Sequence, residues 1–152
     1  MGNVTITQVL NQVVTTLRSN LTDPISGRAA RGHNWIFRDF PRYEPECPYI
    51  KVSSISSQLK PMAIGSSDWR QDVRIQITIV VDEGFTIDYD SDGTDEDADE
   101  LSGYLGNLVL AQLKTQSNFT SVVWNIVPYN EEALHRGGKI YRIIEAKAIA
   151  SR

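Results

Sequence analysis

The clearest candidates for chemistry in this sequence are the carboxylates of one acidic stretch, residues 88–100, which holds eight aspartates and glutamates. Carboxylates at alternate positions ahead of a glycine that permits a sharp turn can converge on the oxygen-rich cage that calcium prefers. The pattern predicts a candidate calcium site formed by Asp88, Asp90, Asp92, Thr94 and Asp99. The competing interpretation is a solvated acidic loop that caps the next helix and holds no cofactor. It is favoured by the short aspartate at the last ligand position and by the strand-like segment before the loop.

A second signal is a long segment rich in arginine and aromatic residues. Residues 24–48 have no regular period and contain several glycines and prolines, so we predict an extended interaction loop. Aromatic and arginine side chains are favoured anchors in protein interfaces. The candidate interface residues are Arg28, Arg31, Trp35, Phe37, Arg38, Phe40 and Tyr43. The same side chains could instead cover an open sheet face, or bind nucleic acid through phosphate contacts and stacking.

Enzyme chemistry has little support in the sequence. Both histidines, His33 and His135, lie in loop-like sequence, and Cys47 has no neighbour in sequence that would lower its pKa. The chain has no nucleophile elbow, no phosphate-binding loop and no zinc motif. The pair Gly103 and Gly106 falls inside a predicted helix, so it cannot form a phosphate-cradling turn. We therefore expect a protein that is not an enzyme.

Length and charge place these signals in an ordinary globular chain. The 152 residues fit a single domain, and the net charge of −4 gives no overall attraction to nucleic acid or to an anionic membrane. The single cysteine excludes an internal disulfide. No apolar run approaches the roughly 18 residues of a membrane span, so no membrane partner is expected.

The elements that must position these residues follow from periodicity. A helical stripe opens the chain, and isoleucines and valines of residues 73–81 alternate with mostly polar residues, as in a strand with one buried face. The predicted elements are a helix at 5–21, strands at 49–54 and 73–82, a helix at 95–115, and strands at 122–129 and 139–149. This α-β-β-α-β-β order predicts an α+β fold: a mostly antiparallel or mixed four-stranded sheet, two helices on one face, and a long arm-like loop. The other sheet face must then be covered by a loop or by a neighbouring subunit.

The order of elements resembles the small tail-terminator, or tail-completion, proteins of long-tailed bacterial and archaeal viruses. The resemblance is carried by the opening amphipathic helix, by residues 37–41 leading through Pro48-Tyr49-Ile50 into the first strand, and by the alternating strand, acidic loop, helix and final strand pair. It covers nearly the whole chain, as one domain over 1–152, and rests on architecture and loose spacing.

The resemblance implies a structural virion protein without an active site. Such a protein forms a ring, usually of six copies, that caps the tail tube and joins it to the head connector, and genomic DNA passes through the ring lumen without sequence recognition. It implies assembly in the host cytoplasm and a place at the tail end or neck of the virion. The loops at 24–48 and 88–100 would contact neighbouring subunits. The alternatives are a neck or head-completion connector protein and a calcium-dependent binding module built on residues 88–99.

Overall fold

The computed structural model describes residues 4–39, 45–61, 69–115, 118–119 and 125–151, which form a single α+β domain. Its elements are α1 (Ile6–Asn20), a 3-10 turn η1 (Ala29–Arg31), β1 (Ile36–Arg38), β2 (Tyr49–Pro61), β3 (Trp69–Asp82), α2 (Ala98–Lys114), β4 (Asn125–Arg136) and β5 (Lys139–Ser151). Neither helix described is long and apolar enough to cross a membrane.

The opening helix begins where its sequence predicts. The Thr5 side chain accepts a hydrogen bond from the Gln8 backbone N–H, and the Gln8 side chain accepts one from the Thr5 backbone N–H, which is a complete capping box. The apolar stripe of α1 is buried, with Leu17 fully inaccessible. Because several β-branched residues weaken the intrinsic propensity of this helix, its stability comes from that packing.

The sheet is mixed and has five strands in the order β1-β2-β3-β5-β4. The prediction of four strands was wrong by one. The short β1 lies within the loop predicted at 24–48 and pairs in parallel with β2, placing Ile36 beside Ile50. The other three pairings are antiparallel, and β3 lies at the centre between β2 and β5.

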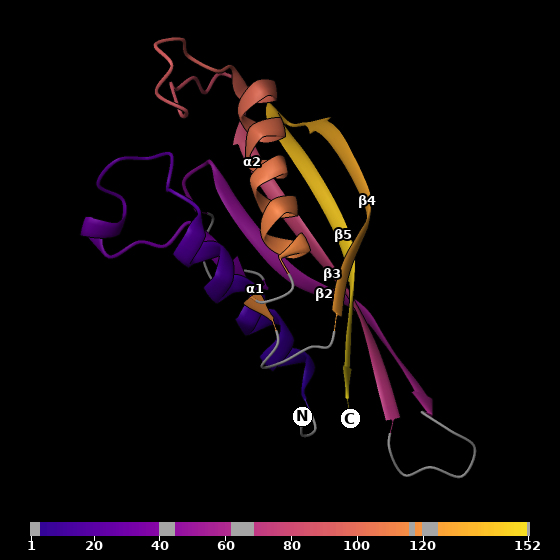
Figure 1. The fold of residues 1–152 in the computed structure, drawn as a ribbon. Helices are drawn as coiled ribbons and strands as arrows, with labels where there is room; N and C mark the ends of the chain where they lie inside the picture. The colour runs from indigo at the N-terminus through magenta and orange to yellow at the C-terminus, as the bar shows by residue number, and fades with distance from the viewer. Residues whose placement is uncertain (1–3, 40–44, 62–68, 116–117, 120–124, 152) are drawn as a thin grey trace.

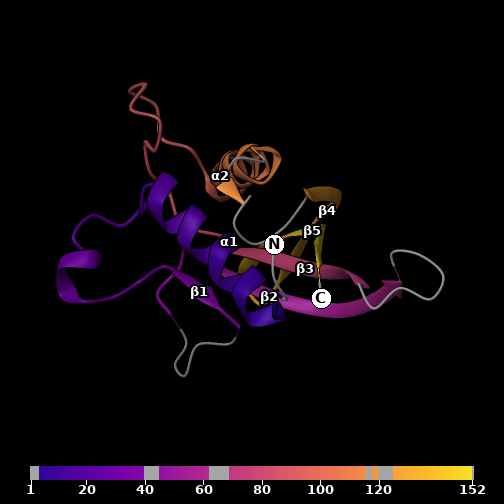
Figure 2. The ribbon, with the colours of Figure 1, turned by 60° about the horizontal axis from the view of Figure 1, so that its bottom comes forward.

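Both helices lie on the same face of the sheet, as the two ribbon views agree (Figures 1 and 2). The odd-numbered residues of β3 from Val73 to Val81 are fully buried beneath them. The core joins these side chains to the apolar faces of both helices, including Leu17 of α1 and Leu105 of α2. The expected arrangement of two helices on one face is therefore confirmed.

All four strands that the sequence pattern predicts are longer than predicted. β2 continues through the serine-rich stretch to Pro61, and β4 continues through most of the connection that was predicted to be a polar loop. Only Gly137 and Gly138, both at positive φ, remain as the turn between β4 and β5. An irregularity between Pro128 and Asn130 interrupts the register of β4 with β5. The predicted strand residues 122–124 lie outside the described residues.

Candidate functional site

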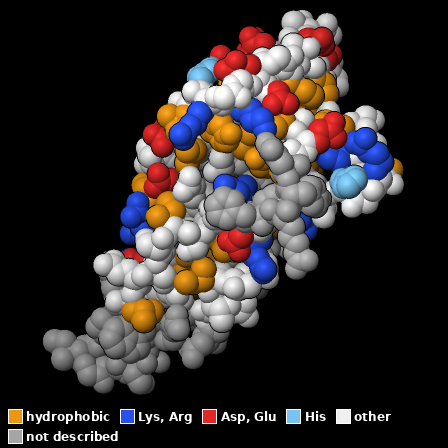
Figure 3. All heavy atoms as spheres, turned by 180° about the vertical axis from the view of Figure 1, so that it is seen from behind, with side chains coloured by type: hydrophobic (Ala, Val, Ile, Leu, Met, Phe, Trp, Pro, Cys, Tyr) orange, Lys and Arg blue, Asp and Glu red, His pale blue; other side chains and the backbone are white. Residues whose placement is uncertain are grey.

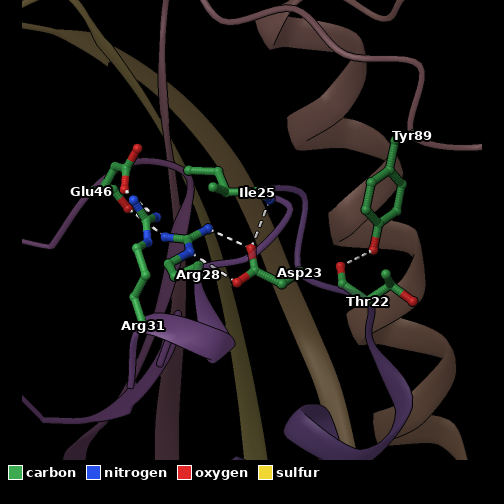
Figure 4. A network of polar contacts seen from close by, with 7 residues as sticks. All are labelled: Thr22, Asp23, Ile25, Arg28, Arg31, Glu46 and Tyr89. Atoms are coloured by element: carbon green, nitrogen blue, oxygen red, sulfur yellow. Dashed lines mark hydrogen bonds and ion pairs between the residues drawn. The ribbon is translucent and has the colours of Figure 1, made fainter. Parts of the chain in front are cut away.

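The beginning of the arm-like loop is held by a buried arginine. The Arg28 side chain is 2% exposed and forms a two-point ion pair with Asp23, with Nη2–Oδ1 at 2.6 Å and Nε–Oδ2 at 2.9 Å. Arg28 Nη1 also donates to the backbone oxygen of Glu46, at 2.7 Å (Figure 4). Asp23 in turn accepts the Ile25 backbone N–H at 2.8 Å. Arg28 therefore lies inside the subunit, where it joins the two ends of the loop.

The other predicted interface residues divide between core and surface. Trp35 belongs to the buried core, whereas Phe37 is half-buried and meets Tyr49 edge to face. Arg31 is exposed and forms an ion pair with Glu46 at 3.3 Å. Arg38 is also exposed and donates to the Asn11 side chain at 2.9 Å. Phe40 and Tyr43 lie outside the described residues. Trp35 is therefore a core residue of the subunit, and among the described candidates only Arg31 and Arg38 are exposed on its surface.

The acidic loop brings four carboxylates together. Ligand atoms of Asp88, Asp90, Asp92 and Glu96 lie within 4.8 Å of one another. Backbone N–H groups support the arrangement: Gly93 N donates to Asp88 at 2.9 Å and Thr94 N donates to Asp92 at 2.8 Å. Desolvation, followed by the hydrogen bond to Glu96, raises the pKa of Asp90. Four carboxylates whose oxygens converge in this way are chemically suited to a hard cation such as calcium.

The fourth carboxylate is not the one that the loop pattern predicts. Glu96 belongs to the cluster because two contacts hold it in place. Its backbone forms an isolated antiparallel bridge with Ile87, and its buried carboxylate accepts the Tyr89 backbone N–H at 2.8 Å. Asp99, predicted as the last ligand, lies instead in the first turn of α2, with Oδ1 at 3.4 Å from His135 Nε2. Thr94, which was also predicted as a ligand, contacts Asp92 through its backbone N–H and not through its side chain. Asp97 caps α2 by accepting the Glu100 backbone N–H, so the loop also has the capping role of the competing interpretation.

One tyrosine fastens the acidic loop to the helix layer. The Tyr89 hydroxyl donates to the backbone oxygen of Thr22, just beyond α1 (Figure 4). The Tyr89 ring meets the ring of Tyr104 of α2 edge to face, with the ring centres 5.4 Å apart. Burial of the ring raises the pKa of Tyr89 to about 12. This contact could not be predicted from local sequence patterns, because it joins residues 67 positions apart.

The sheet face opposite the helices carries apolar and basic groups together. Val80 pairs with Tyr49 and Tyr141, and Tyr141 pairs with Leu134, so the four side chains share this face. Val127, Tyr129 and Leu134 of the edge strand β4 are large hydrophobic residues that are 42–48% exposed. Hydrophobic, basic and acidic side chains are interspersed on the described part of this side of the molecule (Figure 3).

Two hollows lie along that face. The larger, about 450 Å³, is lined by Lys51, Gln76, Thr78, Leu134, Arg136, Tyr141 and Ile143. The smaller, about 350 Å³, is lined by Arg74, Val127, Tyr129 and Lys147. Burial lowers the pKa of Lys51. Arg74 packs over the Tyr129 ring and its Nη2 is 3.5 Å from Glu145. The hollows therefore offer positive charge and aromatic surface side by side.

The groups considered for catalysis are dispersed. His135 is on β4, between Glu83 and Asp99, whereas His33 follows η1 and Cys47 is buried next to Pro48. Gly103 and Gly106 lie within α2, as predicted, and serve packing. A Cβ at Gly106 would lie 2.7 Å from Arg142 Cδ.

Comparison with known proteins adds little beyond this geometry. No model of a known protein family matches the chain, and no curated protein matches its sequence. Among solved structures, a chain described as "Virion of native gene transfer agent (GTA) particle" is similar over 95% of this chain and 95% of its own length, with a TM-score of 0.49 and 10% sequence identity. A likeness at this level carries no functional conclusion.

Proposed function

We propose that this chain is a structural subunit of a virus particle: a tail terminator that forms a ring, caps the tail tube and joins it to the head connector. The observation that carries the proposal is the sheet face opposite the helices. Three large hydrophobic residues of β4 are exposed there, beside two hollows, and such a face is typical of an interaction surface. The type of assembly that we propose, a ring at the end of the tail tube, follows from the resemblance of the order of elements to tail-terminator proteins.

A ring fits the distribution of these features. A closed ring needs two different contact surfaces on each subunit, so that each copy joins its neighbour head to tail. The sheet face lies on one side of the subunit, whereas the acidic loop extends beyond the helix layer on the other (Figures 1 and 2). By this proposal the chain is not an enzyme, its partners are itself, the tube protein and the connector, and its place is the virion neck.

Inactivating the gene in the virus that carries it tests the proposal. A tail terminator stops tube growth, so its loss should give heads without tails together with tubes of uncontrolled length, both visible by negative-stain electron microscopy. Expression of the intact chain from a plasmid is the control and should restore joined particles. Tails of normal length in the absence of the protein would contradict a terminator role.

The same experiment separates the neck alternative. A head-completion connector closes the packaged head, so its loss should leave tails of normal length beside heads that have released their DNA. Gold-labelled antibody against the chain should mark the head–tail junction in both cases, and a virion without label there would exclude both.

The four converging carboxylates favour one second candidate, a calcium-dependent binding module. A ligand that binds only the folded chain increases the free energy of unfolding, by about 2.7 kcal/mol when its concentration is a hundred times Kd. The melting temperature rises as a result. Thermal melts in millimolar calcium, with magnesium as the control, should show a calcium-specific rise that Asp88→Asn abolishes. Equal melting temperatures in both salts would remove this candidate.

A further inference from the structure

We infer that the sheet face opposite the helices is the docking surface for the acidic loop, residues 88–100, of a second copy of this chain. The inference rests on the proposed ring function and names the two surfaces that would meet in it. It is argued from charge, shape and exposed apolar area on the described residues.

Charge complementarity is the first argument. The loop carries eight carboxylates and no lysine or arginine. The two hollows of the opposing face are lined by four basic side chains, which are Lys51, Arg74, Arg136 and Lys147. The acidic groups of the same face lie outside this lining: Glu145 is close to Arg74, Glu132 lies opposite Ile143, Asp72 pairs with Arg70, and Asp82 lies opposite Lys139. The lining of the two hollows contains no carboxylate among the described residues.

The shape of the two surfaces is the second argument. In both ribbon views the segment between β3 and α2 stands clear of the sheet and helices, so its tip is accessible to another molecule (Figures 1 and 2). Asp90, Asp92 and Asp95 near that tip are exposed. The face offers a hollow of about 450 Å³, within the range that receives a compact group of atoms.

Apolar surface is the third argument. Charge alone steers association but adds little affinity when both groups stay in water. Here Leu134 and Tyr141 line the same hollow as Arg136, and Leu134 is 48% exposed. A docked chain would cover these groups, and removing water from around them would strengthen the ion pairs. The contact thus joins steering charge to buried apolar area, as interface anchors usually do.

The geometry gives a head-to-tail contact, because the loop and the face are different surfaces of one subunit. Two variants with opposite changes test it: Asp95→Arg in the loop and Arg136→Glu on the face. Asp95 lies outside the four-carboxylate cluster, so its replacement leaves that cluster intact. Lys114→Glu, at the end of α2, is the matched control for charge reversal away from both surfaces.

Sedimentation of the intact chain at low salt gives the first readout. The wild type and the Lys114→Glu control should self-associate equally, and each of the other two variants should associate at least about tenfold more weakly. An equimolar mixture of the two variants should regain association, because the intact loop of the Arg136→Glu chain meets the intact face of the Asp95→Arg chain, and the two reversed charges are again opposite where the altered loop meets the altered face. Variants that assemble like the wild type would overturn the inference, while leaving the ring proposal in place.

Disulfide trapping decides the case in which the free chain stays monomeric. Asp95→Cys and Arg136→Cys chains, mixed under mild oxidation, should cross-link into covalent heterodimers, because the inferred contact brings these positions together. Cys47 is buried and does not compete. Cross-linking no faster than between Asp95→Cys and Lys114→Cys would overturn the inference. The gene-inactivation experiment, in contrast, tests the ring function itself, because it shows whether particles assemble without this chain.

Discussion

Two glycines of α2, three residues apart, should respond in opposite directions to the same substitution. Both lie in the interior of the helix, where alanine is intrinsically better than glycine by about 1 kcal/mol. At Gly103 the added Cβ would lie 3.7 Å from Arg142 Nη2, an ordinary contact. We therefore expect Gly103→Ala to stabilise the chain by about 0.5–1 kcal/mol.

At Gly106 the helix approaches the sheet more closely. The added Cβ would lie 2.7 Å from Arg142 Cδ and 3.2 Å from Glu131 Oε1. The arginine cannot easily move aside, because Nη1 is 2.7 Å from Glu131 Oε1 and Nε donates to Ser102 Oγ at 3.3 Å. Overpacking of this kind costs about 1–3 kcal/mol, which exceeds the propensity gain. We expect Gly106→Ala to destabilise the chain by about 1 kcal/mol net.

Urea denaturation followed by circular dichroism measures both changes in the free energy of unfolding. A double-mutant cycle with Arg142→Ala sharpens the test, because removing the arginine side chain removes the clash. In that background Gly106→Ala should become neutral or stabilising. If Gly106→Ala stabilises the otherwise unchanged chain as much as Gly103→Ala does, the packing of Arg142 against α2 is refuted.

Three further predictions concern the polar contacts of the loops. Arg28→Ala should destabilise the fold by about 3 kcal/mol in urea, because it leaves a carboxylate without its buried partner, whereas the exposed Arg31→Ala should cost less than about 1 kcal/mol; equal losses would contradict the role of burial. The raised pKa of Asp90 means that the folded chain binds a proton more readily than the unfolded chain, so this group destabilises the fold above its folded pKa and the penalty fades as the pH falls. Asp90→Asn should therefore raise the melting temperature at pH 7 without calcium, by more than the control Asp95→Asn does; no difference would refute it. Tyr89, whose pKa is raised from 10.0 to about 12, should cost stability as the pH rises above about 10, so Tyr89→Phe should show a smaller alkaline loss in pH-dependent melts. It should also be about 1 kcal/mol less stable at pH 7, because it lacks the hydroxyl; an unchanged alkaline loss would show that another group causes it.

The sequence predicted those parts of the fold in which hydrophobic periodicity governs structure. The opening helix and the alternation along β3 both correspond to observed elements. The outer part of β2 was missed because a strand that is exposed on both faces needs no apolar alternation, and serines pair through their backbone as well as any residue. The three-residue β1 was missed because it is defined by a parallel partner and not by its own pattern.

The candidate sites show the same division. Asp88, Asp90 and Asp92 were predicted because of their local spacing, and the structure places their carboxylate oxygens within 4.8 Å of one another. Glu96 was missed because its place depends on a bridge to Ile87, which no loop template includes. The burial of Arg28 depends on Asp23 and on a backbone oxygen 18 residues away, so the side chain could not be distinguished from a surface arginine by composition. The basic character of the open sheet face arises from four strands and has no signature in any one of them.

The irregularity at Pro128 affects the tendency of this chain to aggregate at high concentration. β4 is one of the two outer strands of the sheet, and an outer strand offers backbone groups on which another chain can polymerise as an amyloid-like ribbon. Proline removes one of the N–H groups that such growth needs, the register shift bends the strand beside it, and Glu131 and Glu132 add charge just beyond. The exposed backbone of this outer strand is thereby protected against the addition of strands from other copies of the chain.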